Sequence, residues 1–163
     1  MTNITEPQNK NLNNPILFDT CFIVDLIDKN ENKFDLSHLY LELLISKGYD
    51  PIILSPIFFE TQNKLKNREI NYRPFLDRNL FEYSIEFINE QDLAKAAEIV
   101  IKLEDQSLSL ADAVLAWYSY DNDLQLISYD KDFGIIAQYL ADKYGKNKIL
   151  YWKEIQNEVY KKS

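Results

Sequence analysis

The chain has 163 residues, of which 46% are hydrophobic and 13% aromatic, enough for one domain with a substantial apolar core. Its formal net charge of −8 argues against a simple basic nucleic-acid-binding module. No apolar run approaches the roughly 20 residues that span a bilayer, and the first 14 residues lack the apolar core of a signal peptide. A single cysteine excludes an internal disulfide. Together, these features lead us to expect a cytoplasmic protein without a membrane anchor.

The first residues and the remainder of the chain differ in pattern. Residues 1–14 include five asparagines and little apolar periodicity, which predicts a flexible N-terminal extension. A single domain is expected over residues 15–163. Within it, short apolar runs predict strands at residues 15–19, 51–54, 81–88, 124–128 and 148–151.

Helical patterns occupy the intervals between these strands. They are expected at residues 20–28, 35–47, 55–67, 90–103, 109–120 and 131–143, with a short helix within 68–80 and a terminal helix from Trp152. Ser55 and Pro56 fit the N-cap and the first helical position of the helix at 55–67. The alternation predicts an α/β domain, a three-layer α/β/α sandwich with a mostly parallel, roughly five-stranded sheet.

The chain lacks the residues that several common classes of protein need for their function. With three glycines, it has neither a glycine-rich dinucleotide-binding loop nor a phosphate-binding P-loop. His38 is the only histidine, which excludes a histidine-rich zinc site, and no Ser-His-Asp triad of convincing spacing includes it. We expect His38 to have a surface or packing role. Cys21 is followed by apolar residues and is expected to be a small buried residue rather than a nucleophile.

Four acidic residues stand at comparable points of the predicted fold. Asp19 and Asp130 follow strands, Glu60 lies on the helix after the second strand, and Asp112 lies near the start of an almost wholly apolar helix. Ligands of open α/β sheets bind outside the carboxyl ends of the strands, so these side chains are expected at one edge. Carboxylates gathered there repel one another unless cations neutralise them. The pattern predicts a site for Mg²⁺ or Mn²⁺, which prefer oxygen ligands.

Each of these acids also has a purely structural explanation. Asp19 and Asp130 can cap the helices that follow them, and Glu60 can be a solvated residue on an outer helix face. Asp112 can form a capping box with Ser109, although it is the only charged residue of its helix. A carboxylate buried there without a partner would be costly or become neutral, which favours a role in a site.

Neighbouring polar side chains complete the candidate site. Thr20 and Ser128 carry hydroxyls that can orient a carboxylate or a water molecule. Asp132 lies in the first turn of the helix after Asp130, where acids are favoured, and is a candidate for contact with a metal or its waters. Six basic residues are candidates for phosphate contacts, each being otherwise an ordinary solvated base: Lys64, Lys66, Arg68, Arg73, Arg78 and Lys131.

Four segments together resemble the motifs of PIN-domain proteins, most closely the VapC-type toxin ribonucleases of prokaryotic toxin–antitoxin pairs. They are Phe18-Asp-Thr-Cys-Phe-Ile-Val, Ser55-Pro-Ile-Phe-Phe-Glu60, Leu108-Ser-Leu-Ala-Asp-Ala-Val-Leu-Ala116 and Leu126-Ile-Ser-Tyr-Asp-Lys-Asp-Phe133. The segments follow the family's order over about residues 15–152, and the last two together are the most specific. Ser128 stands where the family often has threonine, and the extension at residues 1–14 is not typical of the family.

The resemblance implies a PIN-like fold and a metal-dependent ribonuclease that hydrolyses RNA phosphodiester bonds within the chain. Carried over to this sequence, it makes Asp19, Glu60, Asp112 and Asp130 the metal-binding catalytic acids. It also implies that the protein is the toxin of a toxin–antitoxin pair, that an antitoxin is its partner, and that it forms a homodimer.

Two other classes of function remain open. A catalytically silent PIN-like module that binds other proteins is consistent with the acidity and the aromatic content. Hydrolases of small phosphate esters that resemble haloacid dehalogenases also carry an aspartate after the first strand. They need a second aspartate two residues on, and position 21 is a cysteine.

Overall fold

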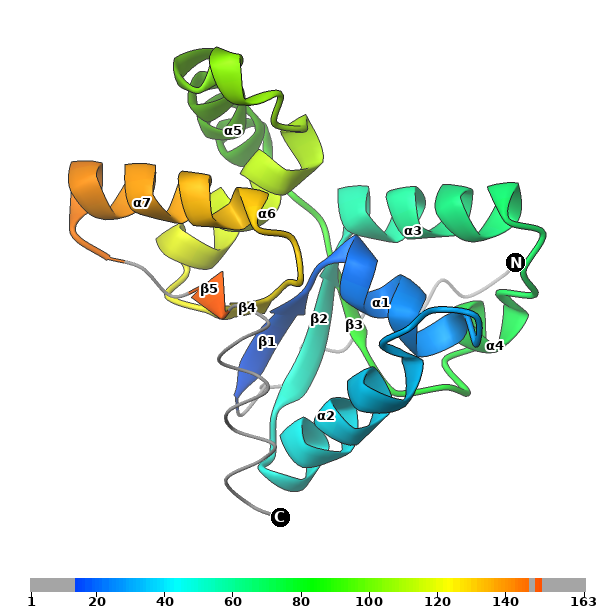
Figure 1. Cartoon of the computed structure of the whole chain (residues 1–163). Helices are drawn as coiled ribbons and strands as arrows, with labels where there is room; N and C mark the ends of the chain where they lie inside the picture. The colour runs from blue at the N-terminus through cyan, green and yellow to red at the C-terminus, as the bar shows by residue number, and fades with distance from the viewer. Residues whose placement is uncertain (1–13, 147–148, 151–163) are drawn as a thin grey trace, which may run out of the picture.

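A five-stranded parallel sheet forms the centre of the computed structural model, which describes residues 14–146 and 149–150 (Figure 1). The order of the strands across the sheet is β3-β2-β1-β4-β5. Their bounds are Pro15–Phe18 for β1, Asp50–Leu54 for β2, Ser84–Glu86 for β3, Gln125–Ile127 for β4 and Ile149–Leu150 for β5. The prediction of a parallel sheet is confirmed.

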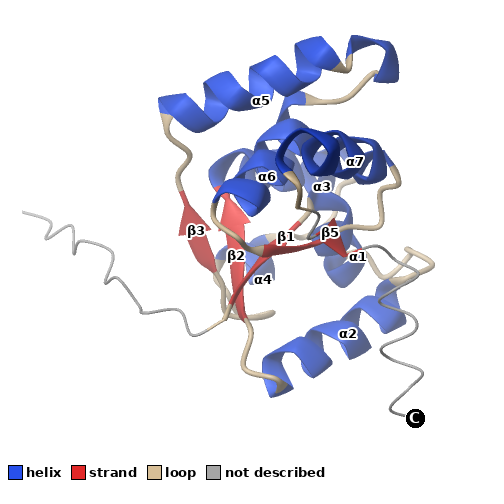
Figure 2. Ribbon diagram, turned by 90° about the vertical axis from the view of Figure 1, so that its left-hand side faces the viewer, coloured by secondary structure: helices blue, strands red, loops and turns tan. Residues whose placement is uncertain are grey.

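The helices form two groups on either side of this sheet (Figures 1 and 2). The first group comprises α1 (Thr20–Ile27), α2 (Phe34–Ser46), α3 (Ser55–Asn67) and α4 (Arg73–Leu76). The second comprises α5 (Glu90–Lys102), α6 (Leu110–Asp121) and α7 (Asp132–Tyr144), with the 3₁₀ turn η1 (Glu104–Gln106) between α5 and α6. Helix α1 packs on α2 and α3, and α6 packs on α5 and α7. The predicted three-layer α/β/α architecture is therefore confirmed.

The central strand β1 is buried on both faces, as a strand covered by two helical layers must be. Ile16, Leu17 and Phe18 have no solvent-exposed surface. The Phe18 ring packs against the edge of Phe22 from α1, with ring centroids 4.8 Å apart, and against Phe81 at 5.8 Å. These aromatic contacts join the sheet to the helical layer that carries α1.

Two helix termini in the second layer follow the capping rules. Asn89 and Asp92 form a reciprocal capping box at the start of α5. At the other end of the layer, α7 ends at Gly145, whose positive φ of 86° is the left-handed conformation in which glycine carries no steric penalty.

The expected role of Ser55 as N-cap of α3 is wrong. Leu54 has the extended backbone of the N-cap, and Ser55 is already helical and makes no side-chain capping bond. The strand β2 runs directly into the helix, so the cap position coincides with a buried strand residue. Pro56 still lies in the first turn, where its missing N–H leaves no hydrogen bond unmade.

The remaining boundaries agree with the predicted ranges to within a few residues. The segments expected to be a flexible extension, up to residue 13, and a terminal helix from Trp152 lie outside the described residues. Within residues 14–146 and 149–150, no helix is long and apolar enough to cross a membrane.

The order of strands reverses direction between β1 and β4. From β1 the chain moves to β2 and β3 on one side, and then returns to β4 and β5 on the other. Helices that follow neighbouring strands diverge to opposite faces at such a point, which leaves a crevice at the carboxyl ends of the strands. The residues directly after β1 and β4 line this crevice.

Candidate active site

Asp19 stands at the carboxyl end of β1, at the point where the strand order reverses. Its side chain is buried, and Ser128 Oγ donates a hydrogen bond to its Oδ2 at 2.8 Å. Burial raises the pKa of Asp19 from 3.8 to about 7, and the neighbouring Asp112 and Glu60 add to this rise. Asp19 is the N-cap residue of α1, as its structural explanation expects, but its carboxylate makes no side-chain capping bond there.

Glu60 faces the same crevice from the second turn of α3. Thr20 Oγ1, at the start of α1, donates a hydrogen bond to Glu60 Oε2 at 3.0 Å. Lys64, one turn further along α3, lies 3.3 Å from Glu60 Oε1. Thr20 and Lys64 therefore each contact one oxygen of the Glu60 carboxylate. Since α1 packs on α3, Glu60 faces α1 and does not lie on an outer helix face.

Asp112 combines the capping role with a place in the crevice. Its backbone N–H donates a hydrogen bond to Ser109 Oγ at 3.0 Å, which caps α6. Burial raises the pKa of the Asp112 carboxyl, and Glu60 and Asp130 raise it further, whereas hydrogen bonding with Ser109 and the charge of Lys64 oppose the rise. The cap uses the backbone N–H of Asp112, and the Asp112 carboxyl interacts with Ser109 as well as with Glu60 and Asp130.

Asp130 follows β4 and is joined to Asp19 through one hydroxyl. Ser128 Oγ, which donates to Asp19, accepts the N–H of Asp130 at 3.0 Å. Asp130 Oδ1 accepts the N–H of Asp132, the first residue of α7, at 2.8 Å. Asp130 thus forms the turn into α7, as its structural explanation requires, and Asp132 contacts it through the backbone.

The four acids come from four separate elements and interact electrostatically with one another. The charge of Asp112 and Glu60 acts on Asp19, and that of Glu60 and Asp130 acts on Asp112. Within residues 14–146 and 149–150, no three acidic, histidine or cysteine side chains meet the geometry for holding one ion as they stand. Binding of an ion would therefore require rotation of the more exposed acids.

The chemistry of this donor set nevertheless fits a divalent cation such as Mg²⁺ or Mn²⁺. All four candidate ligands are carboxylates, which are the oxygen donors that hard cations select. The raised pKa values of Asp19 and Asp112 show that their charge is poorly compensated by the protein. A cation between them would remove that cost.

A cavity of about 280 Å³ lies between residues of α1 and α3 and reaches one of the four acids, Asp130. Asp130 lies in its wall, and so does Cys21, whose thiol has a pKa raised to about 12 by burial. The thiol is therefore not a thiolate nucleophile at neutral pH. The other residues that line this cavity are Val24, Asp25, Glu31, Lys33, Lys64, Arg68 and Tyr129.

Several of these lining residues were not among the expected site residues. Asp25, Glu31 and Lys33 were missed because they do not stand at a strand end or within the four motifs, and Tyr129 was missed because within the fourth motif only the acids and the hydroxyl of Ser128 were considered. Asp25 had one available signal, since it is the only charged residue within the sequence of α1. Of the six candidate basic residues, Lys64 and Arg68 line this cavity.

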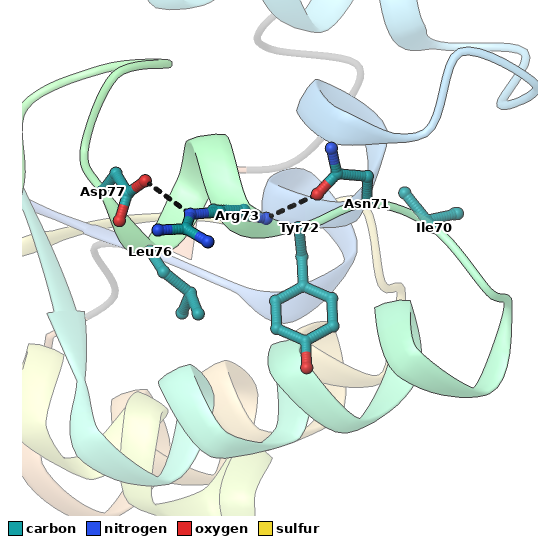
Figure 3. A pocket seen from close by; sticks show the side chains of 6 residues that line it. All are labelled: Ile70, Asn71, Tyr72, Arg73, Leu76 and Asp77. Atoms are coloured by element: carbon teal, nitrogen blue, oxygen red, sulfur yellow. Dashed lines mark hydrogen bonds and ion pairs between the residues drawn. The ribbon is translucent and has the colours of Figure 1, made fainter.

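A second hollow, of about 360 Å³, lies around α4 (Figure 3). Arg73 lines it, but its Nε lies 3.3 Å from Asp77 Oδ2 and its N–H donates to Asn71 Oδ1 at 3.1 Å. None of the four acids lines this hollow. It is not part of the candidate active site.

His38 has the packing role that was expected. Its Nε2 donates to the carbonyl oxygen of Leu26 at 2.8 Å, and its ring packs on Phe34 with centroids 4.6 Å apart. It joins α2 to α1 and does not line the cavity beside Asp130.

Comparison with known proteins places the fold in one family. The family model of the PIN domain matches residues 16–138. No curated protein sequence matches the chain.

Solved structures with this fold include several toxins and toxin–antitoxin complexes. Mycobacterium tuberculosis VapC20, described as a toxin that cleaves the sarcin–ricin loop, has 20% identity and a TM-score of 0.62 over 74% of this chain and 94% of that one. FitAcB from Neisseria gonorrhoeae has 19% identity and a TM-score of 0.58 over 83% and 96%. VapBC2 from Rickettsia felis, bound to a DNA fragment from its promoter, has 15% identity and a TM-score of 0.56 over 85% and 98%.

At these identities the likeness concerns the fold alone. The family model, however, spans most of the described chain and covers Asp19, Glu60, Asp112 and Asp130. The protein belongs to the PIN-domain family.

Proposed function

We propose that this protein is a metal-dependent ribonuclease that hydrolyses phosphodiester bonds within RNA chains. The main support is the crevice where the strand order reverses, which Asp19, Glu60, Asp112 and Asp130 approach from four elements. Membership of the PIN family and the fold shared with VapC20 support the same reading.

In this proposal the four carboxylates hold Mg²⁺ or Mn²⁺, and the neighbouring hydroxyls fix their orientation. Ser128 positions Asp19, and Thr20 positions Glu60, each through one hydrogen bond. A bound divalent cation supplies Lewis acidity, which lowers the pKa of a water molecule and neutralises charge on the phosphate. Glu60 and Asp130 are only partly buried, so each can accept a hydrogen bond from a water molecule that approaches the phosphate.

The biological setting belongs to the same proposal. We infer that the protein acts as the toxin of a toxin–antitoxin pair in the cytoplasm, as a homodimer inhibited by a cognate antitoxin. The structural likeness to toxins and to toxin–antitoxin complexes supports this reading. An antitoxin that offers basic side chains would complement the charge of the crevice.

Replacing Asp112 by Asn tests the catalytic assignment. The amide keeps the size of the side chain and the backbone cap to Ser109, but it removes the charge that a cation needs. We expect Mg²⁺-dependent RNA cleavage to fall by at least about 100-fold, because the cation contributes several kcal/mol to the transition state. The assay is cleavage of a mixed-sequence RNA by purified protein with Mg²⁺, Mn²⁺ or EDTA.

The matched control is Asp121→Asn, which removes the same charge from an exposed position at the opposite end of α6. It should cleave RNA at the wild-type rate. Unchanged cleavage by Asp112→Asn would refute the assignment. Absence of RNA cleavage by the wild-type protein, together with absence of Mg²⁺ binding by calorimetry, would favour the silent protein-binding module instead.

A further inference from the structure

The cavity beside Asp130 is built by four parts of the fold: α1, the loop between α1 and α2, α3, and the loop after β4. Helix α1 contributes Cys21, Val24 and Asp25, which share one helical face because they are three and four residues apart. The loop between α1 and α2 contributes Glu31 and Lys33. The volume of about 280 Å³ is close to the lower end of the range for small-ligand sites, about 300 Å³.

Helix α3 connects this cavity to the catalytic acids. Glu60, Lys64 and Arg68 are spaced four residues apart and therefore form one stripe along the helix. Lys64 lies 3.3 Å from Glu60 and also lines the cavity. A phosphate bound at the four acids would therefore lie close to Lys64. The base of the adjacent nucleotide could then enter the cavity.

The cavity is not a simple phosphate site, because its charges balance and its bases are engaged. Three acids and three bases line it. Arg68 contacts Asp28 at 2.9 Å and also pairs with Glu31. Lys33 lies over the ring of Tyr129, 4.4 Å from its centroid.

Asp25 is the lining carboxylate whose hydrogen-bonding capacity is unused. Its side chain is more than nine-tenths buried, with 7% of its surface exposed. Within the part of the chain that the structure describes, no donor hydrogen-bonds to its carboxylate, in contrast to Glu31 with Arg68 and Asp130 with the N–H of Asp132. The Asp25 oxygens face the cavity and are not sealed from solvent, so both remain able to accept hydrogen bonds from a ligand there.

We propose that this cavity receives a guanine base of the RNA, from the nucleotide next to the scissile phosphate, and that Asp25 selects it. The inference rests on the proposed ribonuclease function and names a base that the enzyme prefers. Asp25 accepts two hydrogen bonds from the base, and Lys64 at the mouth of the cavity contacts the phosphate.

Guanine is the base whose edge matches a single carboxylate. Its N1–H and N2–H₂ donors are adjacent and can both reach the two oxygens of Asp25 in a bidentate arrangement. Uracil presents one N–H between two carbonyl oxygens, which the carboxylate repels, and adenine and cytosine each present one amino group next to an acceptor nitrogen. Recognition of an unstacked base by such edge contacts is the usual way in which proteins read single-stranded RNA.

The first test is nucleotide binding in EDTA, which does not depend on nuclease activity. Guanosine, inosine, adenosine and cytidine 5′-monophosphates are titrated into the protein, and NMR follows the backbone amides of Val24, Lys33 and Tyr129. We expect guanosine monophosphate to bind more tightly than the others by roughly 5- to 150-fold, the usual discrimination of a bidentate base contact. Inosine monophosphate, which lacks the 2-amino group, is the closest comparison.

Asp25→Asn is the decisive variant, because the amide keeps the size of the side chain but replaces one acceptor by a donor. It should reduce the preference for guanosine over inosine monophosphate to less than about twofold, while Asp121→Asn keeps it. Equal binding of all four nucleotides by the wild type, or an unchanged preference in Asp25→Asn, would overturn the inference. A preserved NMR spectrum shows that the variant is folded.

The second test maps cleavage sites in a randomised RNA. Guanine should be enriched at one fixed position beside the cleaved bond, and Asp25→Asn should lose the enrichment. Cleavage without that enrichment would refute the guanine site and leave the nuclease proposal intact. Selective binding of guanosine monophosphate without any RNA cleavage would refute the nuclease proposal and leave the guanine site intact.

Discussion

At the scale of single residues, Asp25 shows how burial of one carboxylate makes stability depend on pH. Burial and the nearby charge of Glu31 raise its pKa from 3.8 to about 6, while Lys33 and Arg68 act in the opposite direction. The folded protein therefore retains a proton that the unfolded chain releases between these two pH values. The contribution of Asp25 to the free energy of unfolding therefore decreases as the pH rises from about 4 to 6, and it stays lost above pH 6.

Replacing Asp25 by Asn should remove this contribution. Relative to the wild type, the variant should be more stable at pH 7 by roughly 2 kcal/mol, with little difference at pH 4. Urea unfolding at a series of pH values, in EDTA, measures the difference between the two proteins. A constant difference across pH 4–7 would show that Asp25 has an ordinary pKa in the folded state.

At the scale of secondary-structure elements, the start of α6 depends on a single capping hydroxyl. Ser109 Oγ accepts the backbone N–H of Asp112, and Ser109, Glu60 and Asp130 all act on the Asp112 carboxyl. Ser109→Ala should lower the free energy of unfolding by about 1 kcal/mol, the usual contribution of an N-cap. Urea unfolding checks this value.

A second variant at the same position supplies the control. Ser109→Asp restores a capping acceptor and should recover most of the lost stability. If Ser109→Ala unfolds like the wild type, the Ser109 bond does not stabilise α6, and the start of the helix depends on packing alone.

The elements themselves were largely predictable from sequence, because their apolar runs have clear strand or helix periods. The strands at Pro15–Phe18 and Gln125–Ile127, with an acid after each, also predicted where the crevice lies. Boundaries were less predictable where one element leads directly into the next. The capping preference of serine predicted Ser55 as the N-cap of α3. The N-cap is instead Leu54, because β2 continues directly into α3.

The cavity was not predictable, because contacts between distant residues create it. Arg68 meets Asp28 and Glu31 across about 40 positions of sequence, and no local pattern of residues predicts such a pairing. Asp25 carried the same signal that identified Asp112, a lone charge in an apolar helix. It was overlooked because it does not stand at the end of a strand or the start of a helix.

At the scale of the whole molecule, the site concentrates negative charge in a protein whose net charge is already −8. Removal of one buried acid should relieve repulsion when no cation is bound, so Asp19→Asn should melt at a higher temperature than the wild type in EDTA. Saturating Mg²⁺ should raise the melting temperature of the wild type by roughly 5–10 °C and that of Asp19→Asn much less.

Differential scanning calorimetry with Mg²⁺ or EDTA tests this expectation, with Asp121→Asn as the variant that should respond as the wild type does. A marked decrease in the melting temperature of Asp19→Asn in EDTA would contradict it. In that case the hydrogen bond from Ser128 to Asp19 would stabilise the end of β1 by more than the repulsion among the acids destabilises it.

The pairing of β1 with β4 has a consequence for the synthesis of the protein on the ribosome. It joins residues 16–18 to residues 125–127, so the middle of the sheet stays open until more than a hundred further residues have been added. Until then Asp19 has neither the Ser128 hydroxyl nor Asp130 beside it. An unfinished chain therefore lacks the assembled crevice. If the crevice cleaves RNA, as proposed, the chain could not cleave the RNA of the ribosome that is synthesising it.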